Sequence, residues 1–147
     1  MFFSNDRNQL RRYYVESWRK ARAGLPLEPL EQMVADVVAA HPEYHALLEN
    51  EDRALGREFL PEHGESNPFA HMGMHIAIRE QVATNRPQGI AALYRRFVKA
   101  LGSPLEAEHL MMEALAEALW HAQRQGTPPD ERAYMLQLKD MLARMGQ

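Results

Sequence analysis

The chain of 147 residues contains no cysteine. Disulfide bonds, thiolate ligands and a cysteine nucleophile are therefore excluded, and a metal site could use only nitrogen and oxygen ligands. No stretch approaches the roughly 18 apolar residues that a membrane span requires. Residues 2–7 pass at once from phenylalanine to polar and charged side chains, which is not the pattern of a secretory signal. We therefore expect a cytoplasmic protein without a membrane-spanning segment.

An excess of positive charge is also missing. The chain has 17 Lys and Arg against 20 Asp and Glu, a net charge of −3 with neutral histidines. Because phosphate backbones are bound by basic faces, nucleic acid is not an expected partner. The sequence also lacks a glycine-rich phosphate loop, a Gly-x-Ser-x-Gly elbow, the His-Glu-x-x-His zincin sequence and the paired Glu-x-x-His repeats of di-iron bundles.

Helical periodicity dominates what is present. No stretch alternates apolar and polar residues in the manner of a strand, so no sheet is expected. The spacing of apolar residues between Pro, Gly and capping residues predicts an all-α, compact bundle of about five to six helices that forms one domain over residues 1–147. Ser4 or Asn5 could cap the first helix, and residues 51–66 are expected to form a long loop with one turn of helix. The expected helices cover residues 6–23, 30–40 with a short continuation over 43–50, 67–84, 89–101, 103–125 and 130–146.

The segment Asn67–Gln81 carries the clearest chemical signal. Its first residue can cap a helix, and His71 and His75 follow four residues apart, so their side chains share one core-type helical face. Inward-facing imidazoles need partners, because an unpaired buried polar group costs about 1–3 kcal/mol. Glycine inside a helix is unfavourable by about 1 kcal/mol relative to alanine, so Gly73 indicates close approach of another helix.

A second helix offers matching ligands. His109, Glu113 and Glu117 recur every four residues in the segment 103–125, and His109 also belongs to an apolar stripe. Two helices that each present ligands four residues apart are a common way to build a metal site in a bundle. Three imidazoles and one carboxylate suit Zn, Fe, Mn or Ni. The predicted metal ligands are His71, His75, His109 and Glu113.

The remaining polar residues have accessory roles in this hypothesis. Glu113 is the fourth ligand or a catalytic acid or base, and Glu117 is either an acceptor that could orient a metal-bound imidazole or a surface residue. His41 and His45 flank a proline and could join the site if their helix packs beside the His71 helix. Because a metal can make bound water nucleophilic, a metal-dependent hydrolase or transferase is the expected class if the protein is an enzyme.

Two other interpretations stay open. In one, the protein is a helical interaction or regulatory module without metal, rich in adaptable Met. His71 and His75 are then structural and bond to Glu113 or to tyrosines, and His41 and His45 are exposed at a helix end. In the other, Trp18, Trp120 and the histidines line a small-molecule pocket. Basic residues such as Arg11 and Arg79 are expected on solvated faces. A small molecule, another protein or a second copy of the chain are all compatible partners.

Four segments carry a family resemblance: Asn67–His75, Glu106–Glu113, Trp120–Asp130 and His41–His45. They resemble a family of short proteobacterial proteins that is known as a domain of unknown function, over nearly the whole chain. The resemblance implies a single-domain bacterial protein and brings no activity, cofactor or substrate. The histidine-bearing helices are also similar, at the level of fold, to metal-binding bundles of the DinB-like class and to hemerythrins, although the hemerythrin ligand pattern is not matched.

Overall fold

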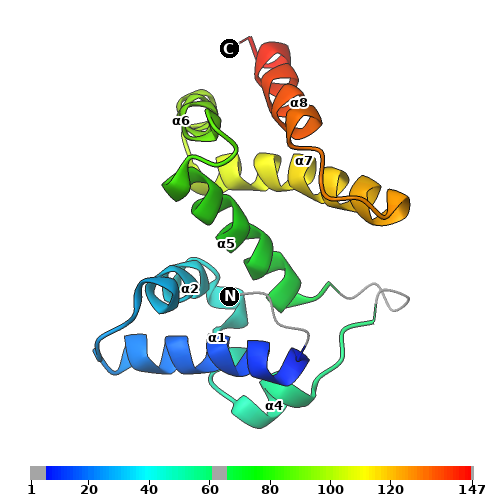
Figure 1. Cartoon of the computed structure of the whole chain (residues 1–147). Coiled ribbons are helices and arrows are strands. Elements are labelled where there is room, and N and C mark those ends of the chain that lie inside the picture. Colours follow the sequence, from blue (N-terminus) through cyan, green and yellow to red (C-terminus); the bar gives the residue numbers. More distant parts are fainter. Residues whose placement is uncertain (1–5, 61–65, 147) are drawn as a thin grey trace. The chain divides into compact units, whose positions relative to one another are not determined.

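The structure is a computed structural model that describes residues 6–60 and 66–146. Within these ranges the regular elements are eight α-helices and one short 3-10 helix, with no strand (Figure 1). The all-α prediction is therefore confirmed, but the expected number of helices is too low. It is too low because α3 (His45–Leu48) and α4 (Glu51–Gly56) form separate short helices where a continuation and a loop with one turn of helix were expected. None of the helices in the described part combines the length and apolar character needed to cross a membrane.

The chain divides into two compact units, Met1–Ile76 and Ala77–Gln147, with the boundary inside the helix α5 (Pro68–Thr84). The expected single domain over residues 1–147 stays a prediction. The first unit contains α1 (Arg7–Arg22), α2 (Pro29–Ala39), the 3-10 helix η1 (Pro42–Tyr44), α3 (His45–Leu48), α4 (Glu51–Gly56) and the start of α5 (Pro68–Thr84). The second contains the rest of α5, then α6 (Ile90–Leu101), α7 (Pro104–Gln125) and α8 (Glu131–Arg144).

In the first unit, α1 packs against α2, α3 and α4. The Asp6 carboxylate caps α1 by accepting the backbone N–H groups of Asn8 and Gln9 at 3.0 and 3.1 Å. The caps expected from the sequence, Ser4 and Asn5, lie outside the described residues. The buried core of this unit consists of apolar residues from every α-helix present: Tyr14, Val34, Val37, Val38, Leu47, Leu48, Ala54, Phe69, Met72 and Ile76.

Arg11 corrects an expectation, because its side chain is only 2% exposed instead of solvated. Its Nη1 group donates to the carbonyl oxygens of Ala54 at 3.0 Å and Arg57 at 2.6 Å. The guanidinium also lies 4.8 Å from the centre of the Phe69 ring. The buried charge thus satisfies carbonyl groups at the end of α4, which a helical periodicity of charge does not reveal.

The neighbour of Gly73 is a side chain of α1, and the close approach of another helix expected there stays a prediction. A Cβ atom at Gly73 would lie 3.4 Å from the hydroxyl oxygen of Tyr14 on α1. Tyr14 is fully buried and donates to the carbonyl oxygen of Phe69 at 3.2 Å. The Asn67 side chain caps α5 as predicted, by accepting the N–H groups of Phe69 and Ala70. The Tyr14 bond joins the first turn of α5 to α1.

Ser17 on α1 provides a stability test of this packing. Its side chain is fully buried, and its hydroxyl has no hydrogen-bond partner among the described residues. We expect Ser17→Ala to raise the free energy of unfolding by about 1 kcal/mol, because it removes an unsatisfied buried group and improves helix propensity. Urea unfolding measures this change. Ser103→Ala is the matched control and should lower the free energy of unfolding by about 1 kcal/mol, because Ser103 caps α7. A Ser17→Ala protein of unchanged or lower stability would contradict the expectation that the Ser17 hydroxyl is unsatisfied.

In the second unit, α7 packs against α6 and α8, and α6 also contacts α8 (Figure 1). The Ser103 hydroxyl accepts the backbone N–H of Glu106 at 3.2 Å, which confirms the predicted cap. The Tyr134 hydroxyl donates to the Gln81 side chain at 2.7 Å and so connects α8 to the end of α5. The largest fully buried side chains of this unit are Ile78, Ile90, Phe97, Met111, Leu138 and Leu142.

Candidate metal centre

His41 is placed by the buried stripe of α2. Val34, Val37 and Val38 are fully buried, and His41 follows Val34 by seven residues on the same face, where it is 3% exposed. Pro42 then starts η1. The Nδ1–H group of His41 donates to the carbonyl oxygen of Val37 at 2.7 Å. Because a carbonyl can only accept, this bond fixes the tautomer and leaves the Nε2 lone pair of the neutral ring available to a metal.

His71 and His75 lie on consecutive turns of α5. His75 is fully buried and His71 is half-buried. Their Nε2 atoms are 3.2 Å apart, so one imidazole donates a hydrogen bond to the other when both are neutral. The spacing of four residues therefore brings the two rings together as the sequence predicts.

These three histidines form one cluster in the first unit, which we call the histidine triad: His41, His71 and His75. The ring centre of His41 lies 5.2 Å from that of His71 and 4.7 Å from that of His75. The ring centres of His71 and His75 are 4.8 Å apart. One nitrogen of each imidazole lies within 4.8 Å of a nitrogen of the other two, so the triad could hold a metal ion.

The spacing of the triad nitrogens is close to that of metal ligands. Two nitrogens bound to one ion at about 2.1 Å lie about 3.0 Å apart at octahedral angles and about 3.4 Å apart at tetrahedral angles. The separation of 3.2 Å between His71 and His75 falls between these values. The His41 nitrogen would need to approach by no more than about 1–2 Å to complete such a set.

Two groups around the triad orient its rings. Metal-bound histidines usually donate their other ring N–H to a carbonyl or carboxylate, and the Val37 carbonyl has this position at His41. The Tyr44 ring stacks on His41 with centres 5.6 Å apart and lies edge-on to His71 at 6.4 Å. Burial, followed by the Glu43 carboxylate, raises the pKa of Tyr44, so its hydroxyl remains protonated at neutral pH.

His45 lies near the triad in sequence but has different partners. Its Nε2–H group donates to the Val38 carbonyl at 2.7 Å, and its ring packs on Trp18 with centres 4.4 Å apart. The exposure expected for His41 and His45 in the interpretation without metal is wrong, because both rings bond to carbonyl groups of α2 and are at least partly buried. Trp18 also donates to Glu49 at 3.3 Å.

The other predicted ligands lie on α7 in the second unit. His109 and Glu113 are exposed, and the buried face of α7 passes instead through Ala107, Met111 and Leu115. The placement of His109 in an apolar stripe is therefore wrong, because the stripe that is buried in the structure contains Ala107 instead. The part of His109 and Glu113 in a metal centre stays a prediction.

Glu117 is exposed on the same helix and has partners within the second unit. Its carboxylate accepts a hydrogen bond from Gln137 at 2.8 Å and lies 3.7 Å from His121. The role expected for it, as an acceptor that orients a metal-bound imidazole, stays a prediction. Trp120 is 53% exposed and lies under the Arg124 guanidinium at 4.7 Å.

His41 is the triad residue that the sequence pattern predicted least well. The proline that follows it suggested an exposed helix end. The available signal was the spacing Val34, Val37, Val38, His41, which continues the buried stripe of α2 for one more turn. A proline ends the hydrogen-bonded helix without ending the buried face.

Fold and site together define an all-helical protein with a buried cluster of histidines. The chain belongs to the family described as Domain of unknown function (DUF1841), whose match covers residues 6–140. No curated protein and no solved structure matches the chain. The family resemblance inferred from the sequence is confirmed, whereas a proteobacterial origin and the analogy with DinB-like bundles stay expectations.

Proposed function

We propose that this protein binds a divalent transition metal through His41, His71 and His75. The observation that supports the proposal is the convergence of their ring nitrogens, with 3.2 Å between the Nε2 atoms of His71 and His75. Zinc, iron and nickel suit such imidazole ligands better than manganese, which prefers oxygen. The burial of His41 and His75 limits the access of solvent to the proposed ion.

Three imidazoles leave at least one coordination position on the ion. Water in that position would become a nucleophile near neutral pH, so hydrolysis or group transfer is the reaction class that the proposal favours if the protein is an enzyme. The sequence predicts His109 and Glu113 as further ligands, and Glu113 alternatively as an acid or base. We keep these roles within the proposal, and the variants His109→Ala and Glu113→Ala test them.

A second candidate function rests on the hydrogen bonds of the same residues. His71 and His75 bond to each other, and His41 bonds to the Val37 carbonyl. Such bonds would satisfy buried imidazoles in a helical interaction or regulatory module that binds no metal. The two candidates differ in one measurable property, the effect of a metal and a chelator on stability.

Zinc is expected to bind the untagged protein in about a one-to-one ratio and to raise its melting temperature. At a free concentration of about 100 times the dissociation constant, the stabilisation amounts to about 2.7 kcal/mol. Elemental analysis and thermal unfolding with and without a chelator measure both effects. Less than about a tenth of an equivalent of any transition metal, unchanged in His71→Ala and with no response to chelator, would leave the module as the better function.

A further inference from the structure

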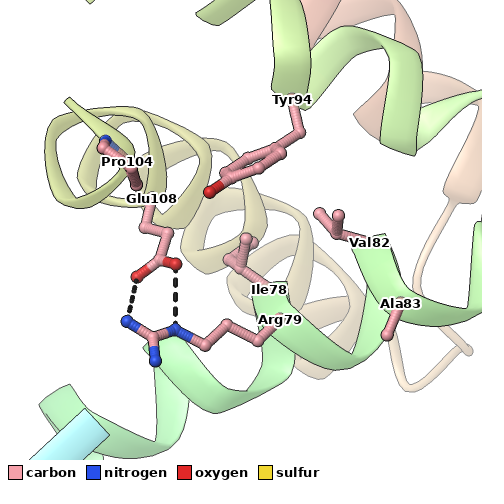
Figure 2. A pocket seen from close by; sticks show the side chains of 7 residues that line it. All are labelled: Ile78, Arg79, Val82, Ala83, Tyr94, Pro104 and Glu108. Carbon is pink, nitrogen blue, oxygen red and sulfur yellow. Dashed lines mark hydrogen bonds and ion pairs between the residues drawn. The ribbon is translucent and has the colours of Figure 1, made fainter. Parts of the chain in front are cut away.

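The second unit contains a cleft of about 310 Å³ that shares no residue with the triad. Its walls come from three helices and are mostly apolar (Figure 2). A volume at the lower end of the range for ligand sites suits a small molecule of about ten non-hydrogen atoms. The cleft is lined by Ile78, Arg79, Val82, Ala83, Tyr94, Pro104 and Glu108.

One end of the cleft is formed by an ion pair with low exposure. The Glu108 side chain is 3% exposed, and its carboxylate accepts from Arg79 at 2.9 Å to Nε and 3.3 Å to Nη2. Arg79 was expected to be a solvated charge, and this expectation is wrong because its guanidinium compensates the Glu108 carboxylate. Since the two charges neutralise each other, this end is polar but has no net charge.

Tyr94 adds a neutral hydrogen-bonding group to the same end. Its side chain is half-buried, and its hydroxyl points towards the Glu108 end of the cleft (Figure 2). Burial, followed by the Glu108 carboxylate, raises the pKa of Tyr94, so the hydroxyl is protonated at neutral pH and can both donate and accept. The rest of the cleft, around Ile78, Val82 and Ala83, offers only apolar contacts.

We propose that this cleft binds an uncharged small molecule that has an apolar body and one hydroxyl or amide group. The apolar body would contact Val82 and Ala83, and its polar group would bond to Tyr94 and the Glu108 carboxylate. An anion or a cation would lose its hydration in the cleft without gaining a counter-charge, because Arg79 and Glu108 already compensate each other. A purely apolar molecule would form no hydrogen bond with Tyr94 or with the Glu108 carboxylate.

Four probes of nearly equal size separate these possibilities: benzyl alcohol, toluene, benzoate and benzylamine. Titration of each into the ¹⁵N-labelled full chain, with chelator present, is followed by amide chemical shifts. Benzyl alcohol is expected to shift the amides of residues 78–83, 94 and 105–108 and to bind about tenfold more tightly than the other three. Because the metal is removed, failure of this experiment does not bear on the triad, and failure of the metal experiment does not bear on the cleft.

Matched variants locate the binding. Ala83→Leu adds bulk at the rim of the cleft and is expected to weaken benzyl alcohol binding about tenfold or more, whereas Ala92→Leu, at an exposed position of α6 outside the cleft, should not change it. Tyr94→Phe removes the hydroxyl and should weaken the alcohol about threefold to tenfold without affecting toluene. Absence of shifts in the cleft, equal binding of all four probes, or equal effects of the two leucine variants would overturn the proposal.

Discussion

Replacement of His41 by alanine is expected to weaken zinc binding by about a hundredfold or more. Loss of a partner that only orients a ligand already costs about 10–100-fold in metal affinity, and His41 is proposed to be a ligand itself. Its Nδ1–H group is held by the Val37 carbonyl, so the ring is oriented before the metal arrives. Competition titration against a chromophoric chelator measures the dissociation constants of the wild-type and variant proteins.

His45→Ala is the control for this measurement. His45 lies four residues from His41 and also donates to a carbonyl of α2, but its ring packs on Trp18 instead of on the other histidines. The two variants should therefore lose a similar hydrogen bond to α2, while only His41→Ala loses affinity for zinc. Equal dissociation constants for the two variants would show that His41 is not a ligand. They would favour the module that binds no metal, in which the histidines are structural.

The second large effect is expected from Arg79→Met, which should lower the free energy of unfolding by about 2–4 kcal/mol. Removal of one partner of a buried ion pair costs about 3–5 kcal/mol, and we lower this figure because the Arg79 side chain is 25% exposed. The variant leaves the Glu108 carboxylate, which is 3% exposed, without its guanidinium partner. Urea unfolding at pH 7 measures the change in the midpoint, with an unchanged slope as the check on cooperativity.

The double variant Arg79→Met/Glu108→Leu separates a lost attraction from an unpaired charge. If the cost comes from the unpaired carboxylate, the double variant should recover most of the stability, because apolar side chains of similar volume often replace a buried ion pair without loss. A double variant no more stable than Arg79→Met would contradict this account. So would an Arg79→Met protein within about 0.5 kcal/mol of the wild type, the range of ordinary surface changes.

Local signals predicted most of the secondary structure. The expected helix over residues 6–23 corresponds to Arg7–Arg22, and that over 103–125 to Pro104–Gln125. The starts of α5 and α7 could be predicted because the side chains of Asn67 and Ser103 accept hydrogen bonds from backbone N–H groups two or three residues further along the chain. The short helices α3 and α4 were harder, because helices of four and six residues show less than two full turns of periodicity.

The sequence by itself determined that the chain is helical, where the main helices begin, and that His71 and His75 meet on one face of α5. These features depend on residues within a few positions of each other, which interact whatever the rest of the chain does. Only the tertiary structure decided that His41 joins them, that Arg11 is buried on the carbonyls of α4, and that Glu108 is the partner of Arg79. Each of these depends on which helices pack together, and packing is decided by the burial of whole faces, a property that no local spacing contains.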